Sequence, residues 1–434
     1  MGIYFGTDGL RGIYGEEISS QIAFNCGNSL SRLCEKKKII IGRDTRTSGP
    51  TLLHSFVSGM LCGGVDVIDV DIATTPAIAF LTKHLKLDYG IVISASHNPS
   101  IFNGIKIFNS KGYKISEEIE NQIERKMLQQ YTKSSNNLGN YTYNPKLIDI
   151  YIDKLKYRYK DPTKLKIVID CANGASFNIA KRTFNSLNKN VIFINANNDG
   201  KNINNNCGAI SPNELLDNVK KNKADIGFAF DGDADRIIVS DENGNILDGD
   251  DILYLISCYG NNKIDKIVGT TMTNKGLEQS LLKKGIKLIR ADVGDKYVVE
   301  NMIKNNALLG GETSGHIILH KFATTGDGLL TALEICSIVQ KYKQKISKLI
   351  NYKKYPQINI NIPVKDKFRI LNSEKLSKEV LHIQEIFKDD GRVLVRASGT
   401  EPKIRIMCEH IKKNIASKYS KSLKSLVLTL NEKI

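Results

Sequence analysis

The stretch KIIIGRDTR, from Lys38 to Arg46, joins a run of isoleucines to a polar turn that contains glycine. Two other stretches repeat this arrangement, KIVIDCANG at Lys166–Gly174 and KIVGTTMTN at Lys266–Asn274. In each, the apolar β-branched run predicts a short buried strand, and the residues after the turn are typical of a helix. A strand, a turn and a helix in that order predict a parallel α/β sheet. We therefore expect one α/β unit that is used three times.

The chain changes character after about residue 355. Ile358–Val364 alternates apolar and polar residues, which predicts a half-buried strand, and a helix over Ser373–Phe387, two strands and a closing helix follow. Polar stretches rich in Asn and Lys mark the expected boundaries. The predicted fold class is α/β, with three related α/β domains whose sheets are mixed and mostly parallel, and a small C-terminal α+β domain. The expected domains are residues 1–145, 146–246, 247–355 and 356–434.

Composition excludes several classes of protein. The 434 residues include 62 Lys and Arg and 46 Asp and Glu, a net charge of +16, and 41% are hydrophobic, as in a folded protein. We expect no membrane partner because no apolar run approaches ~18 residues and the N-terminus lacks signal-peptide regions. We expect no nucleic-acid partner because the lysines form only short runs without stacking aromatics. Eight scattered cysteines indicate a reducing, cytoplasmic location.

Three alternating carboxylates follow the apolar run Ile226–Phe230. Three oxygen ligands of this kind suit Mg²⁺ and leave coordination positions for a phosphoryl group. An EF-hand is the alternative, because Glu242 is the twelfth residue of the loop, but Arg236 stands where an EF-hand has glycine and strands are expected on both sides. The sequence therefore predicts a magnesium site formed by Asp231, Asp233 and Asp235.

Three other loops carry polar groups that suit a ligand, and two of them also have a plain structural interpretation. Ser96, in the loop SASHNP, is either a nucleophile or part of an ordinary turn, and without a G-x-S-x-G elbow hydrolase chemistry has little support. The loop GETSGH, Gly311–His316, offers a carboxylate and a hydroxyl that suit sugar hydroxyls, although the pattern alone is not specific. The loop RASGTEP, Arg396–Pro402, is either a phosphate-binding nest or a plain hairpin loop.

Taken together and in order, the motifs FGTDGLRG, SASHNP, DGDADR, GETSGH and RASGTEP resemble those of the α-D-phosphohexomutase superfamily, over the whole chain. Gly294–Val298 and Thr325–Gly328 favour the branch that acts on glucosamine phosphate. The resemblance implies four domains around a central cleft. It also implies an isomerase that interconverts glucosamine 6-phosphate and glucosamine 1-phosphate, and that supplies the synthesis of amino-sugar nucleotides and cell-wall precursors. The implied intermediate or activator is glucosamine 1,6-bisphosphate or glucose 1,6-bisphosphate.

The resemblance also assigns roles to individual residues. Ser96 would be the phosphoserine and would hold Mg²⁺ with the three aspartates. Because a phosphoserine carries about −1.5 to −2 charges, such a site would be net negative by roughly −3 and would need nearby cations. The remaining expected catalytic residues are the cations Arg11, Lys106 and Arg236, with His97 as a hydrogen-bond partner or proton relay. The expected substrate-binding residues are Glu312, Ser314 and His316 for the sugar, and Arg396, Ser398, Gly399 and Thr400 for the non-reacting phosphate.

Two alternatives stay open at this point. Thr313 stands where the glucosamine branch commonly has Gln, which leaves activity on mannose or glucose phosphates open. A sugar-phosphate-binding protein without turnover is the alternative of a different class, but it would be expected to lack Ser96 or one of the aspartates. We expect a small-molecule sugar phosphate as partner and leave a homodimer open.

Overall fold

The structure is a computed structural model that describes residues 4–6, 8–129, 135–159, 164–398 and 401–434. The chain forms two compact units. The main unit contains residues 1–272 and 289–350, and the C-terminal unit contains residues 273–288 and 351–434. Within the described residues the strands form four sheets, three with flanking helices and one in the C-terminal unit, which confirms the expected fold class. The expected domain boundaries stay a prediction.

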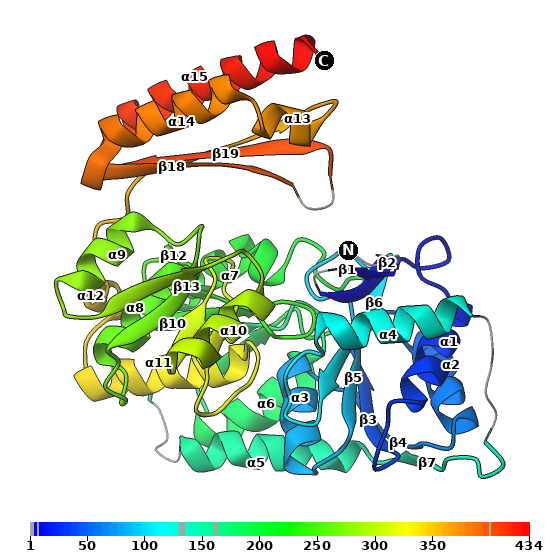
Figure 1. Cartoon of the computed structure of the whole chain (residues 1–434). Helices are drawn as coiled ribbons and strands as arrows, with labels where there is room; N and C mark the ends of the chain where they lie inside the picture. Colours follow the sequence, from blue (N-terminus) through cyan, green and yellow to red (C-terminus); the bar gives the residue numbers. More distant parts are fainter. Residues whose placement is uncertain (1–3, 7, 130–134, 160–163, 399–400) are drawn as a thin grey trace. The chain divides into compact units, whose positions relative to one another are not determined.

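The first sheet of the main unit has seven strands among the described residues. The strands are β1 (Phe5–Gly6), β2 (Gly9–Ile13), β3 (Lys38–Arg43), β4 (Asp66–Ile72), β5 (Tyr89–Ile93), β6 (Phe102–Asn109) and β7 (Tyr141–Tyr143). The helices are α1 (Ser20–Ser31), α2 (Gly49–Cys62), α3 (Thr75–His84) and α4 (Glu117–Leu128). Strands β5, β3, β4 and β7 are parallel, and β1, β2 and β6 continue the sheet antiparallel beyond β5. The sheet lies between α3 and the pair α1 and α2 (Figure 1).

This arrangement follows from the isoleucine run in β3. Ile39 and Ile41 pack in one core with residues of α1, α2 and α4, while Ile40 points to the opposite face of the sheet, where α3 lies. All three side chains are fully buried. A strand that is buried on both faces reads as a continuous apolar run, and this explains why KIIIG shows no alternation.

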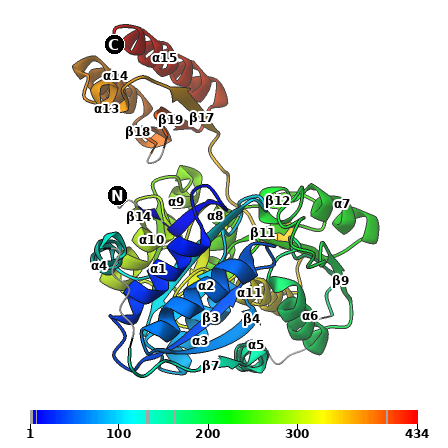
Figure 2. The same cartoon turned by 90° about the vertical axis from the view of Figure 1, so that its right-hand side faces the viewer.

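Two further sheets complete the main unit. The second has the order β12-β11-β10-β8-β9, with α6 and α7 beside it (Figure 2), and the third has the order β14-β13-β15-β16. The stretches at Lys166 and Lys266 form β8 and β13, so the repeated strand units are confirmed. The bounds are α5 (Ile148–Arg158), β8 (Ile167–Asp170), α6 (Ser176–Leu187), β9 (Val191–Ile194), α7 (Asn213–Asn222), β10 (Ile226–Phe230), β11 (Ile237–Ser240), β12 (Ile246–Leu247), α8 (Gly249–Tyr259), β13 (Lys266–Thr270), β14 (Lys287–Ala291), α10 (Asp295–Asn305), β15 (Leu309–Gly311), β16 (Ile317–Leu319), α11 (Gly328–Tyr342) and α12 (Ile346–Leu349).

The ends of three strands carry the loops of interest. Strand β5 ends three residues before Ser96, β10 ends directly before Asp231, and β15 ends directly before Glu312. In α/β sheets, ligands bind beyond the carboxyl ends of the strands. The three sheets therefore each supply one loop of this kind.

The C-terminal unit is an antiparallel sheet covered by helices. Its sheet has the order β17-β19-β18, and the expected alternating strand is β17. One face packs against α14 and α15 around Ile362, Ile404 and Phe387. The bounds are α9 (Lys275–Leu282), β17 (Gln357–Pro363), α13 (Lys367–Leu371), α14 (Glu374–Phe387), β18 (Gly391–Ala397), β19 (Lys403–His410) and α15 (Lys413–Glu432).

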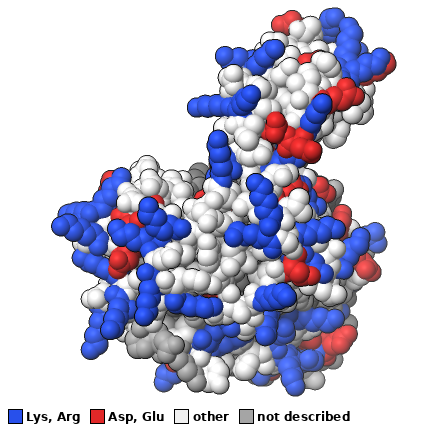
Figure 3. Space-filling view, turned by 90° about the vertical axis from the view of Figure 1, so that its left-hand side faces the viewer, with Lys and Arg blue, Asp and Glu red and all other residues white. Residues whose placement is uncertain are grey.

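The charged surface, the apolar character of the helices and the state of the cysteines are features for which the composition gave expectations. On the face drawn in Figure 3, basic side chains are spread over the surface with acidic ones between them. Among the helices of the described residues, none combines the length and the apolar character that a membrane crossing requires. All eight cysteines are free thiols.

The contact between α1 and α2 provides a test of the packing. A Cβ atom on Gly59 would lie 2.2 Å from the carbonyl oxygen of Phe24, and one on Gly27 would lie 2.3 Å from that of Phe56. We expect Gly59→Ala to lower the free energy of unfolding by about 1–3 kcal/mol because the helices must separate, although alanine by itself favours a helix. Urea unfolding measures this, with the exposed Ser58→Ala as the control; equal stability of both variants would contradict the close packing.

Candidate active site

Ser96 is held at the end of β5 in an unusual backbone conformation. Its φ is +51°, in the left-handed region, and only 1% of the residue is exposed. The Ser96 backbone N–H donates to Ser94 Oγ at 2.9 Å, and Ser94 Oγ donates to Asp44 Oδ2 at 2.6 Å. The Ser96 hydroxyl donates to Asp231 Oδ2 at 2.5 Å, and His97 Nδ1 lies 3.3 Å from Ser96 Oγ. The loop thus directs the hydroxyl at the first of the three aspartates.

A buried arginine fixes the shape of this loop. The Arg46 side chain is fully buried, and all five N–H groups of its guanidinium are used in hydrogen bonds. The acceptors are the Asp44 carboxylate and the carbonyl oxygens of Ser96, Asn98, Pro99 and Phe102. Sequence reasoning treated Arg46 only as part of a turn after a strand. It gave no sign that the side chain binds a loop fifty residues away.

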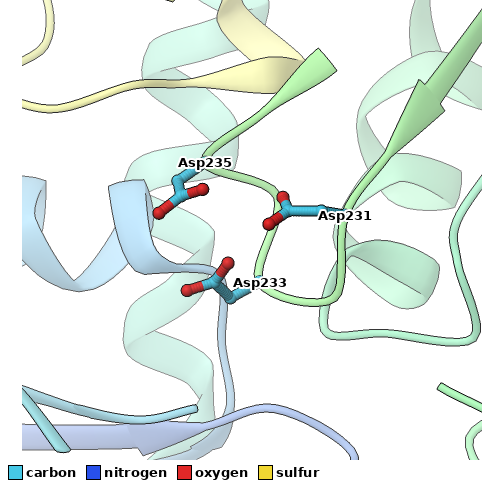
Figure 4. Close-up of side chains that lie close together, drawn as sticks. All are labelled: Asp231, Asp233 and Asp235. Atoms are coloured by element: carbon cyan, nitrogen blue, oxygen red, sulfur yellow. The ribbon is translucent and has the colours of Figure 1, made fainter. Parts of the chain in front are cut away.

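The three aspartates converge as predicted. One carboxylate oxygen from each lies within 4.8 Å of the others, and all three residues are buried. Figure 4 shows the carboxylates turned toward one another from a single loop. Asp233 Oδ1 and Asp235 Oδ1 are buried and make no hydrogen bond. Because an unpaired buried carboxylate oxygen is costly, these atoms fit the ligands of a metal ion.

Cations surround the aspartates. Lys106, which is 1% exposed, donates to Asp233 Oδ2 at 2.7 Å and to Asp235 Oδ2 at 2.8 Å. Asp8 in turn forms salt bridges with Arg11 and with Lys114. Lys106 and Arg11 are thus two of the expected cations that lie at the site. Asp8 and Lys114 were missed, although Asp8 lies in the quoted motif FGTDGLRG.

The pKa values show how unbalanced the charges are. Burial raises the pKa of Asp231 well above its ordinary value, and Asp235 and Asp233 raise it further. Burial would also raise the pKa of Asp235, but Lys106 and His316 outweigh it and hold that pKa well below its ordinary value. Burial would lower the pKa of Lys106, but Asp233 and Asp235 raise it well above its usual range. The cluster therefore has room for more positive charge near Asp231.

Two more expected residues, His97 and Arg236, lie beside the cluster. The Arg236 backbone N–H donates to Asp231 Oδ1 at 3.1 Å. Burial lowers the pKa of His97 to about 4, with Arg236 and Arg11 adding to the effect. The His97 imidazole is therefore neutral near pH 7.

The GETSGH loop brings a histidine to the same place. His316 Nδ1 lies 3.7 Å from Asp235 Oδ1, and the Gly326 backbone N–H donates to His316 Nε2 at 2.9 Å. Glu312 Oε1 accepts a hydrogen bond from the Gly294 backbone N–H at 3.0 Å. Ser314 is exposed and Glu312 is almost buried, so the loop offers one polar group to solvent and anchors another.

The expected phosphate-binding residues lie in the C-terminal unit. Arg396 and Arg405 are register partners on β18 and β19, and the Arg405 guanidinium donates to Ser398 Oγ at 3.2 Å. Lys367 donates to the Ser398 carbonyl oxygen at 2.8 Å. Sequence reasoning missed Arg405 and Lys367, both of which add positive charge beside the loop. The expected residues Gly399 and Thr400 lie outside the described residues.

The role of Arg46 is testable through stability. We expect Arg46→Met to lower the free energy of unfolding by about 3–5 kcal/mol, because it leaves the buried Asp44 carboxylate without its cation and removes one donor from each of four carbonyl oxygens. Arg43→Met is the matched control: this neighbouring, less buried arginine pairs with Asp71 at 2.6 Å, and its loss should cost at most about 1 kcal/mol. Urea unfolding measures both, and similar small losses would refute a bracing role for Arg46.

Four protein families match successive parts of the chain. The families described as phosphoglucomutase/phosphomannomutase alpha/beta/alpha domains I, II and III match residues 2–134, 149–244 and 248–355. The C-terminal domain of the same group matches residues 360–419.

Curated relatives and solved structures agree with this match. The phosphoglucosamine mutase of Clostridium beijerinckii is 42% identical over 425 residues, which cover 94% of this chain and 95% of that protein. The phosphoglucosamine mutase of Clostridium acetobutylicum is 43% identical over 425 residues, with the same coverage. A phosphoglucomutase/phosphomannomutase family protein of Burkholderia thailandensis has a similar fold, with a TM-score of 0.84 at 23% identity over 99% of this chain and 98% of that one. Aspergillus fumigatus N-acetylphosphoglucosamine mutase, solved in complex with GlcNAc-6P and magnesium, has a TM-score of 0.69 at 16% identity over 99% and 96%.

Four domain families match in the expected order, and the curated relatives are similar over nearly their full length. The chain belongs to the phosphoglucomutase/phosphomannomutase family, within the α-D-phosphohexomutase superfamily, and in it to the phosphoglucosamine mutases.

Proposed function

We propose that this isomerase interconverts glucosamine 6-phosphate and glucosamine 1-phosphate, with Ser96 as the residue that carries the transferred phosphoryl group. One observation carries the proposal: the Ser96 hydroxyl lies 2.5 Å from Asp231 at the edge of a buried cluster of three carboxylates. A phosphoryl group on this hydroxyl would lie beside the three carboxylates, two of which Lys106 contacts.

The residues present fit Mg²⁺ as the metal. The donors are carboxylate oxygens, two of which have no hydrogen-bond partner, and magnesium prefers oxygen ligands. Asp231, Asp233 and Asp235 would hold the ion together with a phosphoryl oxygen on Ser96. Mg²⁺ bound there would neutralise part of the negative charge on the transferring phosphoryl group.

The first half of the cycle transfers phosphate to the sugar. O1 of glucosamine 6-phosphate attacks the phosphorus on Ser96, the new O1–P bond forms, and the bond from phosphorus to Ser96 Oγ breaks. The O1 proton passes to a basic group in the site, and His97, close to Ser96 Oγ, is placed to relay it. Ser96 is left as a hydroxyl, and the sugar is left as glucosamine 1,6-bisphosphate.

The second half returns a phosphoryl group to the enzyme. The bisphosphate turns over so that its 6-phosphate faces Ser96. Ser96 Oγ attacks that phosphorus, its proton passes to the basic group in the site, and O6 leaves with the proton that this group returns. Ser96 is phosphorylated again, and glucosamine 1-phosphate leaves. Arg11, Lys106 and Arg236 stabilise charge on the transferring group, and Glu312, Ser314 and His316 bind the sugar. Arg396, Ser398, Gly399 and Thr400 bind the phosphate that does not react.

Glucosamine phosphate is the preferred substrate in this proposal, because the relatives above 40% identity are phosphoglucosamine mutases. Thr313, which departs from the common Gln, donates to Asp250 Oδ1 at 3.1 Å. A side-by-side assay of glucosamine, mannose and glucose 6-phosphates tests the preference, and we expect the highest kcat/KM with the glucosamine compound. A cytoplasmic location, supported by eight free thiols, and a homodimer stay predictions.

The phosphoserine is tested by Ser96→Ala. We expect the variant to fold and to lose turnover by at least about 1,000-fold, because no other group in the cycle holds the phosphoryl group. Intact-protein mass spectrometry should find one phosphoryl group on the wild type and none on the variant. Ser100→Ala, in the same loop, is the matched control and should keep the group. A folded Ser96→Ala protein with full turnover would end this mechanism.

The phosphate subsite is tested by Arg396→Ala. Its contact exists in ground state and transition state alike, so its loss should raise KM about 10- to 100-fold with a smaller fall in kcat. The variant should also release bisphosphate, and added glucosamine 1,6-bisphosphate should restore part of the rate. Arg396→Lys should show a milder defect. Arg369→Ala, an exposed arginine of the same unit, is the control; a fall in kcat alone would move Arg396 out of this subsite.

A further inference from the structure

A second concave site lies in the main unit, and none of the residues assigned to the phosphoryl-transfer site lines it. It has a volume of about 280 Å³. Its walls come from α3, from α5 and from the segment His320–Leu330. Four basic side chains face it: Lys83, Lys154, Arg158 and Lys321.

Three of these cations, Lys83, Lys154 and Lys321, form no salt bridge within the described residues. Arg158 forms a salt bridge with Glu334 at 3.1 Å, so its charge is already balanced. Lys154 donates only to the Phe322 carbonyl oxygen, at 3.1 Å, and its Nζ lies 3.9 Å from the centroid of the Phe80 ring. Within the part of the chain that the structure describes, neither Lys83 nor Lys154 takes part in a salt bridge.

The acidic residue of the site does not supply this balance. The Asp327 carboxylate is buried and accepts hydrogen bonds from the Tyr151 hydroxyl, at 2.9 and 3.0 Å, and from the Leu330 backbone N–H at 2.9 Å. It caps the start of α11. Because Glu334 balances Arg158, the three lysines and the one carboxylate that line the site leave a formal charge of +2.

A residue with a buried, unpartnered hydroxyl lines the same site. Thr325 lines it, is 3% exposed, and its hydroxyl makes no hydrogen bond. A buried hydroxyl without a partner is unfavourable, and a hydrogen bond to it would remove that penalty. Burial also lowers the pKa of Lys154; Asp327 offsets part of this, while Lys83 and Arg158 lower the pKa further. A bound anion would raise the pKa of Lys154, against the effects of burial and of the two neighbouring cations.

We propose that this pocket binds a phosphate dianion, free or carried on a small molecule, at a site separate from Ser96. Phosphate suits the site because ammonium groups such as those of Lys83 and Lys154 bind it as point charges, and its several oxygens can accept from several donors. The volume lies at the small end for ligand pockets, which favours one phosphate on a small body over a dinucleotide. The ligand would also contact the loop in which Gly326 donates to His316.

Isothermal titration of the full-length protein with inorganic phosphate tests the site. We expect two binding events per chain in the wild type. Lys154→Gln should weaken one of them at least tenfold, and Arg396→Ala should weaken the other. Lys156→Gln is the matched control, since this lysine lies on the same helix, pairs with Asp153 at 3.8 Å and does not line the pocket. Repeating the titration with glucosamine 6-phosphate distinguishes a carried phosphate from a free one.

The outcomes separate this inference from the proposed function. The proposal would be overturned if Lys154→Gln kept both binding events. It would also be overturned if Lys154→Gln and Lys156→Gln weakened phosphate binding equally. If Lys154→Gln lost one binding event and Arg396→Ala lost none, the result would support phosphate binding in the pocket. It would count against the proposed role of Arg396. Lys83→Gln changes an exposed side chain and cannot disturb the core, so it should weaken the same event as Lys154→Gln even if the latter folds poorly.

Discussion

The burial of three carboxylates at one point is the constraint on which the rest of this site depends. Like charges held this close in a nonpolar setting are unfavourable unless cations compensate them. Lys106 bridges Asp233 and Asp235, and the opposite pKa directions of Asp231 and Asp235 show that the compensation is incomplete near Asp231. That local deficit of positive charge is where a metal ion and the transferring phosphoryl group would meet.

The same constraint gives a reason for the hydrogen bonds around Ser96 if this residue is the proposed phosphoryl donor. A phosphoryl donor must face the carboxylates at a fixed distance, because catalysis of phosphoryl transfer is mostly positioning and electrostatics. Arg46, in the Lys38–Arg46 stretch, holds the Ser96 loop in position because its guanidinium donates to four carbonyl oxygens there. Asn204, from the second sheet's domain, adds a bond to the Ser96 carbonyl oxygen at 2.8 Å. The strand unit that determines the fold thus also holds the loop.

The sequence predicts the loops better than the contacts between them. Ser96 and Asp231 were found because each follows a buried apolar strand, and a strand end places its loop at one edge of a sheet. Lys114 and Arg46 were missed because their partners lie fifty or more residues away, at Asp8 and in the Ser96 loop. The left-handed φ of Ser96 was also beyond prediction, since serine has no preference for that region. Long-range electrostatics, unlike strand periodicity, leaves no local pattern.

The central claim, that Ser96 donates its phosphoryl group to the sugar, can be measured in a single turnover. The protein is labelled with radioactive phosphate at Ser96, freed of small molecules, supplied with Mg²⁺ and mixed with unlabelled glucosamine 6-phosphate in less than one equivalent. The account predicts that the label leaves the protein and appears first in glucosamine 1,6-bisphosphate and then in glucosamine 1-phosphate. Label that stays on Ser96 while product forms, or that appears only as inorganic phosphate, would contradict it.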